Sequence, residues 1–131
     1  MKKLQIKIPL ILPEVTDEKD QCVEKLIEQL SGFEYVYHLA ALADLNAAKA
    51  RPIETVAINI QGTVNMLEAC RVNNVKRFVF GSTVYVYSRE GSFYRCSKQA
   101  CENYVEEYYN QFGLEYTILR YGSLYGPRTD M

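Results

Sequence analysis

The sequence lacks the features that mark nucleic-acid-binding, metal-binding and membrane-spanning proteins. Its 15 basic and 16 acidic residues leave a net charge of −1, so we expect no nucleic acid and no anionic membrane among its partners. Its single histidine and its four cysteines, which include no C-x-x-C pair, do not make a zinc site, and we expect no metal. No apolar run approaches the ~18 residues that span a bilayer.

The cysteines and the N-terminus both indicate a cytoplasmic protein. We expect the cysteines to be reduced, buried thiols rather than disulfides. The opening stretch MKKLQIKIPLILP places lysines before an apolar run, as a secretion signal does, but Lys7 and Pro9 interrupt the run and no small-residue cleavage site follows. A strand is the better interpretation of this stretch.

What is present is the composition and the alternating pattern of an α/β domain. With 48% apolar and 24% charged residues, the chain is expected to form one domain over residues 1–131. Apolar runs predict strands over residues 4–12, 34–39, 77–82 and 116–121. Strands that alternate with amphipathic helices form a parallel sheet with right-handed crossovers. We expect the strands 34–39, 77–82 and 116–121 to be adjacent in that order, with 4–12 outside 34–39.

Three helices are predicted between the strands from apolar residues at helical spacing. The first is capped by Asp17 and ended by Gly32, and its stripe is Val23, Leu26, Ile27 and Leu30. The second covers residues 53–72, and its predicted core-facing stripe is Ile53, Val56, Ile60, Val64 and Leu67. The third covers residues 94–112, and its stripe is Tyr94, Lys98, Cys101, Val105, Tyr108 and Phe112. Residues 40–52, which are mostly small, are expected to form a loop.

Tyr94 and Lys98 are spaced as a proton-transfer pair would be. One helical turn places residues i and i+4 on the same face, about 6 Å apart along the axis. An ammonium group there favours the tyrosinate, and a hydroxyl from a strand end can share the phenol's hydrogen bond. The same spacing also occurs in an amphipathic helix that merely carries a tyrosine in its apolar stripe, so the spacing alone leaves both interpretations open.

Polar or small groups follow each predicted strand at its carboxyl end, where open parallel sheets bind ligands. They are Glu14, residues 38–41, Ser82 with Thr83, and Gly122 with Ser123. Their convergence predicts a binding cleft at this edge of the sheet.

Five ordered motifs resemble one known family. They are His38-Leu39-Ala40-Ala41, Asn59-Ile60-Gln61-Gly62-Thr63, the segment TVYVY, Tyr94-Arg95-Cys96-Ser97-Lys98, and the stretch from Leu119 to Arg128. Together they resemble the extended short-chain dehydrogenase/reductases, the NAD-dependent epimerase/dehydratase family that acts on nucleotide sugars. The resemblance covers about residues 12 to 128. It implies a Rossmann-like parallel sheet with flanking helices, without the first glycine-rich βα unit and without the C-terminal substrate domain.

The resemblance implies roles for particular residues. Tyr94 would be the general acid/base, Lys98 would bind the nicotinamide ribose and lower the tyrosine pKa, and Thr83 would hydrogen-bond the reacting oxygen. The residues implied to bind NAD are Glu14, Val15, Leu39, Ala40, Ala41, Asn59, Tyr94, Lys98, Tyr121 and Gly122. The substrate contacts implied are Thr83 and Ser123. For Asn59, a polar residue on a solvent-exposed helix face is the alternative.

The sequence departs from the family pattern at several places. Glu14 stands where the family carries an aspartate for the adenine side, and Gly122 and Ser123 replace an aromatic residue and an asparagine. The loop between Thr83 and Tyr94 is shorter than the family's. No G-x-G-x-x-G or G-x-x-G-x-x-G occurs, although a dinucleotide's pyrophosphate needs such glycines at a helix N-terminus.

Two interpretations therefore remain. The chain is a piece of an NAD-dependent nucleotide-sugar epimerase or dehydratase, or it is an inactive relative that serves as a binding or assembly module. In either case we expect a homodimer through helices 53–72 and 94–112, because Tyr104, Tyr108 and Tyr109 supply more aromatic surface than one sheet-facing stripe can bury. We also expect the isolated chain to bind NAD weakly.

Overall fold

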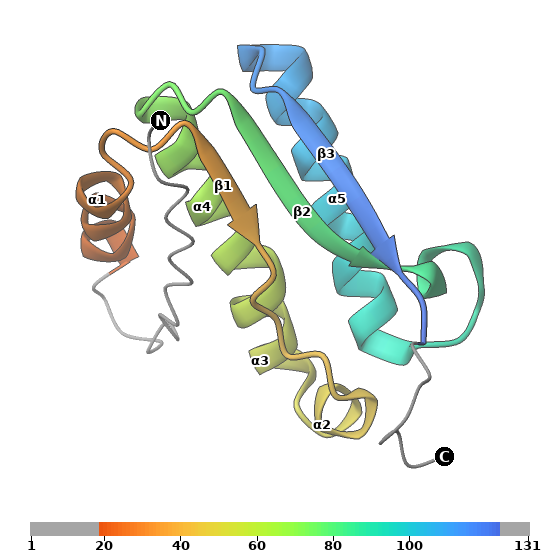
Figure 1. The fold of residues 1–131 in the computed structure, drawn as a ribbon. Helices are drawn as coiled ribbons and strands as arrows, with labels where there is room; N and C mark the ends of the chain where they lie inside the picture. Colours follow the sequence, from red (N-terminus) through yellow and green to blue (C-terminus); the bar gives the residue numbers. More distant parts are fainter. Residues whose placement is uncertain (1–18, 124–131) are drawn as a thin grey trace, which may run out of the picture.

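The computed structural model describes residues 19–123, at the centre of which lies a three-stranded parallel sheet (Figure 1). Its strands are β1 (Tyr35–His38), β2 (Arg77–Thr83) and β3 (Tyr116–Tyr121), in the order β1-β2-β3. The predicted order of these three strands is confirmed. The strand predicted over residues 4–12 lies outside the described residues.

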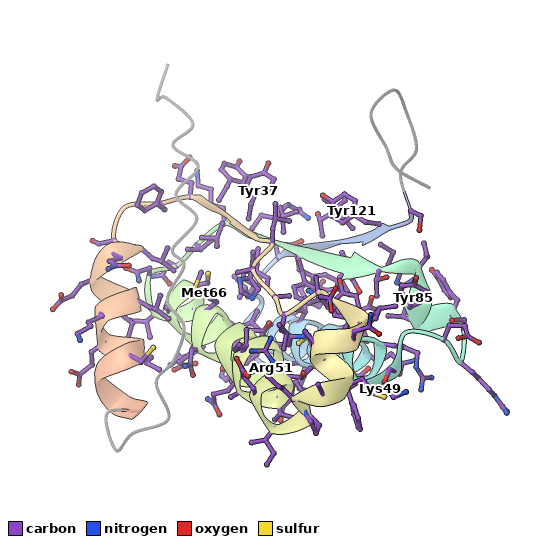
Figure 2. All side chains as sticks on the ribbon, turned by 90° about the horizontal axis from the view of Figure 1, so that it is seen from below. Tyr37, Lys49, Arg51, Met66, Tyr85 and Tyr121 are labelled. Carbon is purple, nitrogen blue, oxygen red and sulfur yellow. The ribbon has the colours of Figure 1, made fainter. Side chains whose placement is uncertain are left out.

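The helices of the described chain cover one face of this sheet, as the view from below in Figure 2 shows. They include α1 (Lys19–Gln29), α4 (Gly62–Val72) and the long α5 (Ser92–Phe112). Apolar side chains between these helices and the sheet form the core: Leu26, Leu30, Val36, Met66, Leu67, Cys70, Phe78, Phe80, Cys101 and Val105. The predicted stripe of α5 is buried at Lys98, Cys101 and Val105, but its last member, Phe112, is exposed. Among residues 19–123, no helix is both long enough and apolar enough to cross a membrane.

The opposite face of the sheet carries exposed aromatic side chains. Along β1 the side chains alternate, because successive residues of a strand point to opposite faces. Val36 and His38 are buried on the helix side, whereas Tyr35 and Tyr37 are 47% and 39% exposed. Within residues 19–123, no helix covers this second face (Figure 2).

The loop predicted over residues 40–52 is wrong in its second half, which forms the helix α2 (Leu45–Ala50). The Asp44 side chain caps the helix by accepting a 2.7 Å bond from the Ala47 amide. Alanine has the highest helix propensity, so the small residues that suggested a loop favour a helix once a cap is present.

The helix predicted over residues 53–72 exists, but its N-terminal half presents a different face. It consists of α3 (Pro52–Thr55), the π-helical segment η1 (Val56–Gln61) and α4. Ile53 and Val56, predicted to face the core, are 84% and 53% exposed. The buried positions are polar instead: Thr55, Asn59 and Thr63. A π-turn adds a residue to the turn and so changes which side chains face the sheet, which a constant period of 3.6 does not predict.

Candidate active site

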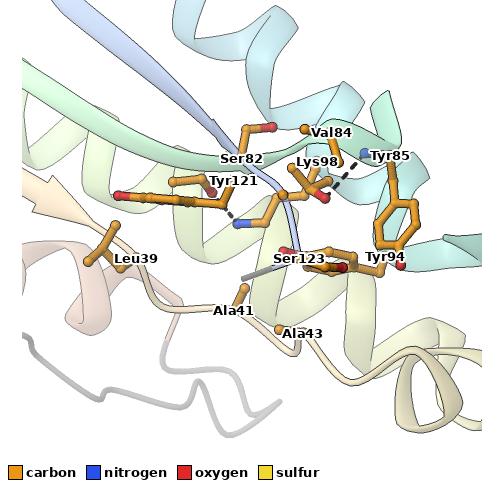
Figure 3. A pocket seen from close by; sticks show the side chains of 13 residues that line it. Leu39, Ala41, Ala43, Ser82, Val84, Tyr85, Tyr94, Lys98, Tyr121 and Ser123 are labelled. Carbon is orange, nitrogen blue, oxygen red and sulfur yellow. Dashed lines mark hydrogen bonds between the residues drawn. The ribbon is translucent and has the colours of Figure 1, made fainter. Parts of the chain in front are cut away.

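A cavity of about 380 Å³ opens at the carboxyl ends of the three strands, the expected place for a ligand on a parallel sheet (Figure 3). Most of the predicted site residues line it: Leu39, Ala41, Thr83, Tyr94, Lys98, Tyr121, Gly122 and Ser123. The cavity is also lined by Ser82, which was expected at this strand end, and by four residues for which the sequence predicts no role: Ala43, Gly81, Val84 and Tyr85. The structure therefore brings together residues from the segment after β1, from β2 and β3, and from α5.

Lys98 is the buried cation of this cavity. It is 2% exposed, and its Nζ donates a 2.7 Å hydrogen bond to the carbonyl of Gly81 (Figure 3). The same Nζ lies 4.6 Å from the ring centroid of Phe80 and 5.7 Å from that of Tyr94. Burial lowers the pKa of Lys98 to about 8, against the smaller raising effects of Cys101 and Glu102. At neutral pH the Lys98 side chain is therefore positively charged in most molecules.

Tyr94 lies in the first turn of α5, and the expected spacing relative to Lys98 holds. The predicted lowering of the Tyr94 pKa by Lys98 is wrong for this structure. Burial raises the pKa of Tyr94, and the neighbouring Tyr85 raises it further. Without a ligand, desolvation of the phenolate outweighs any help from the ammonium group, which donates its hydrogen bond to Gly81. Tyr94 therefore keeps its proton at neutral pH.

Thr83 ends β2 and also begins the short 3₁₀ helix η2 (Val84–Tyr87). Its side chain is nearly buried, and its Oγ1 accepts a 3.3 Å bond from the Tyr85 amide. The hydroxyl hydrogen is thus available to a partner in the cavity, because this bond uses only the oxygen. Gly91, just before α5, allows the close packing behind Tyr85, since a Cβ there would lie 2.9 Å from the Tyr85 ring.

Asn59 is a buried hub and does not line the cavity. Its side chain makes two bonds with the backbone of Leu42, accepting from the amide at 2.7 Å and donating to the carbonyl at 3.2 Å. It also donates to the Ser97 hydroxyl at 2.9 Å, so it joins η1 to α5 and to the segment after β1. At 1% exposed it is not the solvent-facing residue of the alternative interpretation.

His38 extends this polar layer under the sheet. The Thr63 hydroxyl donates a 2.6 Å bond to the Asn59 carbonyl, so its oxygen is left to accept from His38 Nε2 at 3.0 Å. His38 is thus the Nε2–H tautomer. Burial, together with the charge of Lys98, lowers the pKa of His38 to about 4, and the ring is neutral at physiological pH.

Comparison with known families adds an independent finding. The model of the NAD dependent epimerase/dehydratase family matches residues 4–131. The chain belongs to this family. The resemblance inferred from the five motifs is confirmed, as is the Rossmann-like parallel sheet.

Individual family members are similar over most of the chain. The UDP-glucuronate 4-epimerase of Thermodesulfobacterium geofontis is 32% identical over 122 residues, which are 82% of this chain and 38% of that protein. The structure of the Thermotoga maritima UDP-glucose 4-epimerase with UDP-glucose matches with a TM-score of 0.74 at 30% identity, over 89% of this chain and 43% of that one. The Thermus thermophilus UDP-glucose 4-epimerase with NAD matches with a TM-score of 0.70 at 34% identity, over 86% and 40%. The chain thus spans well under half of the length of these relatives.

The remaining site residues that the sequence predicts lie outside the cavity or outside the described residues. Ala40 is partly buried beside the lining residues without lining the cavity itself. Glu14 and Val15 lie outside the described residues. Tyr85 lines the cavity although the sequence predicts no role for it, and it stands two positions after Thr83 within the TVYVY motif.

Proposed function

We propose that the chain carries the catalytic centre of an NAD-dependent nucleotide-sugar epimerase or dehydratase. The observation that supports this proposal is the meeting of Thr83, Tyr94 and Lys98 in one cavity, from two separate elements. Thr83 lies at a strand end and the other two on one face of α5, so the meeting depends on the tertiary fold. A helix that only buried a tyrosine would not need a hydroxyl and an ammonium group beside it.

The lining residues fit the nicotinamide and ribose end of NAD. Leu39 and Tyr121 provide apolar walls for a ring, and Lys98 provides the cation for ribose hydroxyls. Gly81 allows the Leu39 side chain to pack closely against β2, because a Cβ there would lie 2.9 Å from that side chain. When bound, NAD supplies the hydride acceptor and, in its oxidised form, a positive charge that favours the tyrosinate.

Tyr94 is proposed to exchange the proton of a sugar hydroxyl. In the oxidation direction its phenolate oxygen takes the proton from that hydroxyl, and the sugar carbon becomes a ketone. In the reverse direction its phenol returns the proton to the ketone oxygen. The raised pKa of Tyr94 favours this second step, since the phenol holds its proton until an acceptor arrives. Thr83 would orient the reacting oxygen through its available hydroxyl hydrogen.

A nuclear magnetic resonance titration with NAD into the millimolar range tests this proposal. We expect the resonances of Thr83, Tyr94 and Lys98 to shift, while those of Arg77 at the opposite end of β2 stay in place. Lys98→Met should abolish the shifts, and Lys76→Met, at an exposed lysine outside the cavity, should preserve them. Shifts that are absent at these residues, or that survive Lys98→Met, would contradict the proposal.

A second candidate function is a binding or assembly module without turnover. The exposed apolar side chains on the outer helices favour an assembly role. Ile53 and Val56 lie on α3 and η1, and Tyr104 on α5 is 46% exposed. We propose that these helices pair with those of a second copy, as a homodimer. The two functions are compatible, and sedimentation together with the NAD titration separates them.

A further inference from the structure

A hydrogen-bonded cluster with two charged members lies beside the cavity and plays no part in the proton transfer proposed above. Arg120 of β3 forms a two-point contact with Glu102 of α5, through Nε to Oε1 at 3.1 Å and Nη2 to Oε2 at 2.7 Å. The Ser82 hydroxyl donates to the same Oε1 at 2.5 Å, and Arg120 Nη1 donates to the Tyr87 hydroxyl. We refer to Ser82, Tyr87, Glu102 and Arg120 as the Arg120 cluster. It joins β2, β3, η2 and α5.

One member of the cluster, Ser82, lines the cavity itself, and the others lie close in sequence to lining residues. Glu102 is one helical turn beyond Lys98, which is itself one turn beyond Tyr94, so the three share a face of α5. Ser82 directly precedes Thr83. The sheet register pairs Ser82 with Arg120 and Thr83 with Tyr121, so cluster and cavity occupy adjacent steps of the same two strands.

The Glu102 carboxylate depends on these bonds because it is 7% exposed. Burial alone would raise the pKa of Glu102, but the hydrogen bonds from Arg120 and Ser82 outweigh burial and lower it. A fork of guanidinium donors fixes a carboxylate in both distance and direction, which an ammonium group does not. The cluster therefore specifies one position of α5 relative to the strand ends.

We propose that Arg120 is a positioning residue of the candidate site: its guanidinium holds Glu102, and with it the helix face that carries Tyr94 and Lys98, against the ends of β2 and β3. The meaning of this placement for catalysis rests on the proposed function. The placement itself does not, since it can be measured without cofactor or substrate.

An ordinary stabilising ion pair is the competing explanation, and the charge around Lys98 distinguishes the two. The titratable and charged groups that face Lys98 are Glu102, Cys101 and Tyr94 of α5 and His38 of β1, with Arg120 of β3 behind Glu102. Removing Arg120 leaves the carboxylate unbalanced, and the Lys98 ammonium becomes easier to form. Removing the charge of Glu102 makes it harder to form. These opposite shifts are what an ion pair without a positioning role predicts, because the geometry around Lys98 then stays the same. Loss of positioning instead releases the helix face, exposes Lys98 to water and raises its pKa in both cases.

The test is the titration of the Lys98 ammonium resonance in the lysine-labelled chain, assigned with Lys98→Met. Arg120→Met should raise the pKa of Lys98 by about one unit, and Glu102→Gln should raise it as well, because either change loosens the helix face and lets water reach the ammonium group. The double variant should stay raised, because either change alone already releases the face. Arg77→Met is the matched control, since Arg77 bonds the Tyr116 carbonyl and Thr117 at the other end of the sheet.

A raised Lys98 pKa in both single variants and in the double variant supports the proposal. Opposite shifts that cancel in the double variant, or no shift beyond that of Arg77→Met, overturn it. If Arg120→Met does not fold, the isosteric Glu102→Gln decides alone, because a fall of the Lys98 pKa in that variant contradicts the proposal. An NAD titration without binding would count against the proposed function and leave this result unchanged.

Discussion

Lys98 Nζ donates its hydrogen bond to the carbonyl of Gly81, 2.7 Å away, and not to Tyr94, which stands one helical turn before it. The ammonium group is thus tied to the end of β2 in a nearly closed environment. Its burial has a cost that the rest of the fold must offset, because a charged group loses its hydration there. Residues kept for chemistry often reduce stability in this way.

Lys98→Met should change how stability depends on pH. The folded-state pKa of Lys98 is about 8, against 10.5 for an ordinary lysine, so the unfolded chain holds more protons between these limits. Stability of the wild type therefore rises with pH across this window, by about 3 kcal/mol in all. Lys98→Met lacks this rise. Between pH 8 and pH 9.5 the unfolding free energy of the wild type should therefore increase relative to that of Lys98→Met. Urea unfolding measures it, and parallel curves would contradict the buried ammonium.

His38 should make the chain less stable in mild acid. Its folded-state pKa is about 4 against 6.5, so protons bind more readily to the unfolded chain as the pH falls through this range. The stability present above pH 6.5 is lost towards pH 4, by about 3 kcal/mol. The chain has one histidine, which makes the assignment direct. His38→Phe should remove the slope between pH 5 and 7, and a slope that persists in it would point to another group.

Asn59→Ala should destabilise the chain by about 3 kcal/mol, because the Leu42 backbone groups would lose their partner in a part-buried site. The loop that contributes Ala41 and Ala43 to the cavity should become more mobile, with faster amide exchange at Leu42. Asn110→Ala is the control, since Asn110 is exposed and bonds only within its helix, and its effect should stay within about 0.5 kcal/mol. Equal effects in both variants would show that the hub is dispensable.

Calorimetric titration of the purified chain with NAD should give a dissociation constant no better than millimolar. The sequence contains no glycine-rich phosphate turn, and each charge-assisted bond to a phosphate contributes ~1.5–3 kcal/mol. Losing two or three such bonds weakens binding by several orders of magnitude. We expect no measurable turnover of UDP-glucose. Micromolar affinity would show that other groups of this chain bind the pyrophosphate. Tyr94→Phe should preserve the fold and abolish any turnover that is seen. Tyr104→Phe should preserve both the fold and that turnover.

Tyr104→Glu should convert the proposed dimer to a monomer, because it places a charge on the outer face of α5. Sedimentation at micromolar concentration measures the change. Tyr37→Glu introduces the same charge on the open face of the sheet, where Tyr37 is 39% exposed, and should leave the dimer intact. A wild-type monomer, or dissociation caused by Tyr37→Glu alone, would contradict assembly through the helices.

Much of the fold could be predicted because it follows from local patterns. The apolar runs that became β1, β2 and β3 were recognisable, and their predicted order is observed. Right-handed crossovers fix this order only when the connecting helices lie on one face of the sheet, as they do here. The spacing of Tyr94 and Lys98 also predicted that both lie on one face of α5, because residues four positions apart share a face of any helix. The helix α2 was missed although its cap, Asp44, and its alanines were visible, because small residues were interpreted as a loop.

The sequence by itself determined the three strands, the family and most of the predicted residues that meet at the strand ends, since all of these depend on periodicity and motif. Only the tertiary structure decided how the polar groups between them are satisfied. Asn59 contacts Leu42 across 17 positions, and Arg120 contacts Glu102 across 18. The π-turn that buries Asn59 and the desolvation that raises the pKa of Tyr94 arise from packing between elements. Burial and partnership are properties of the assembled fold, and no local pattern of residues carries them.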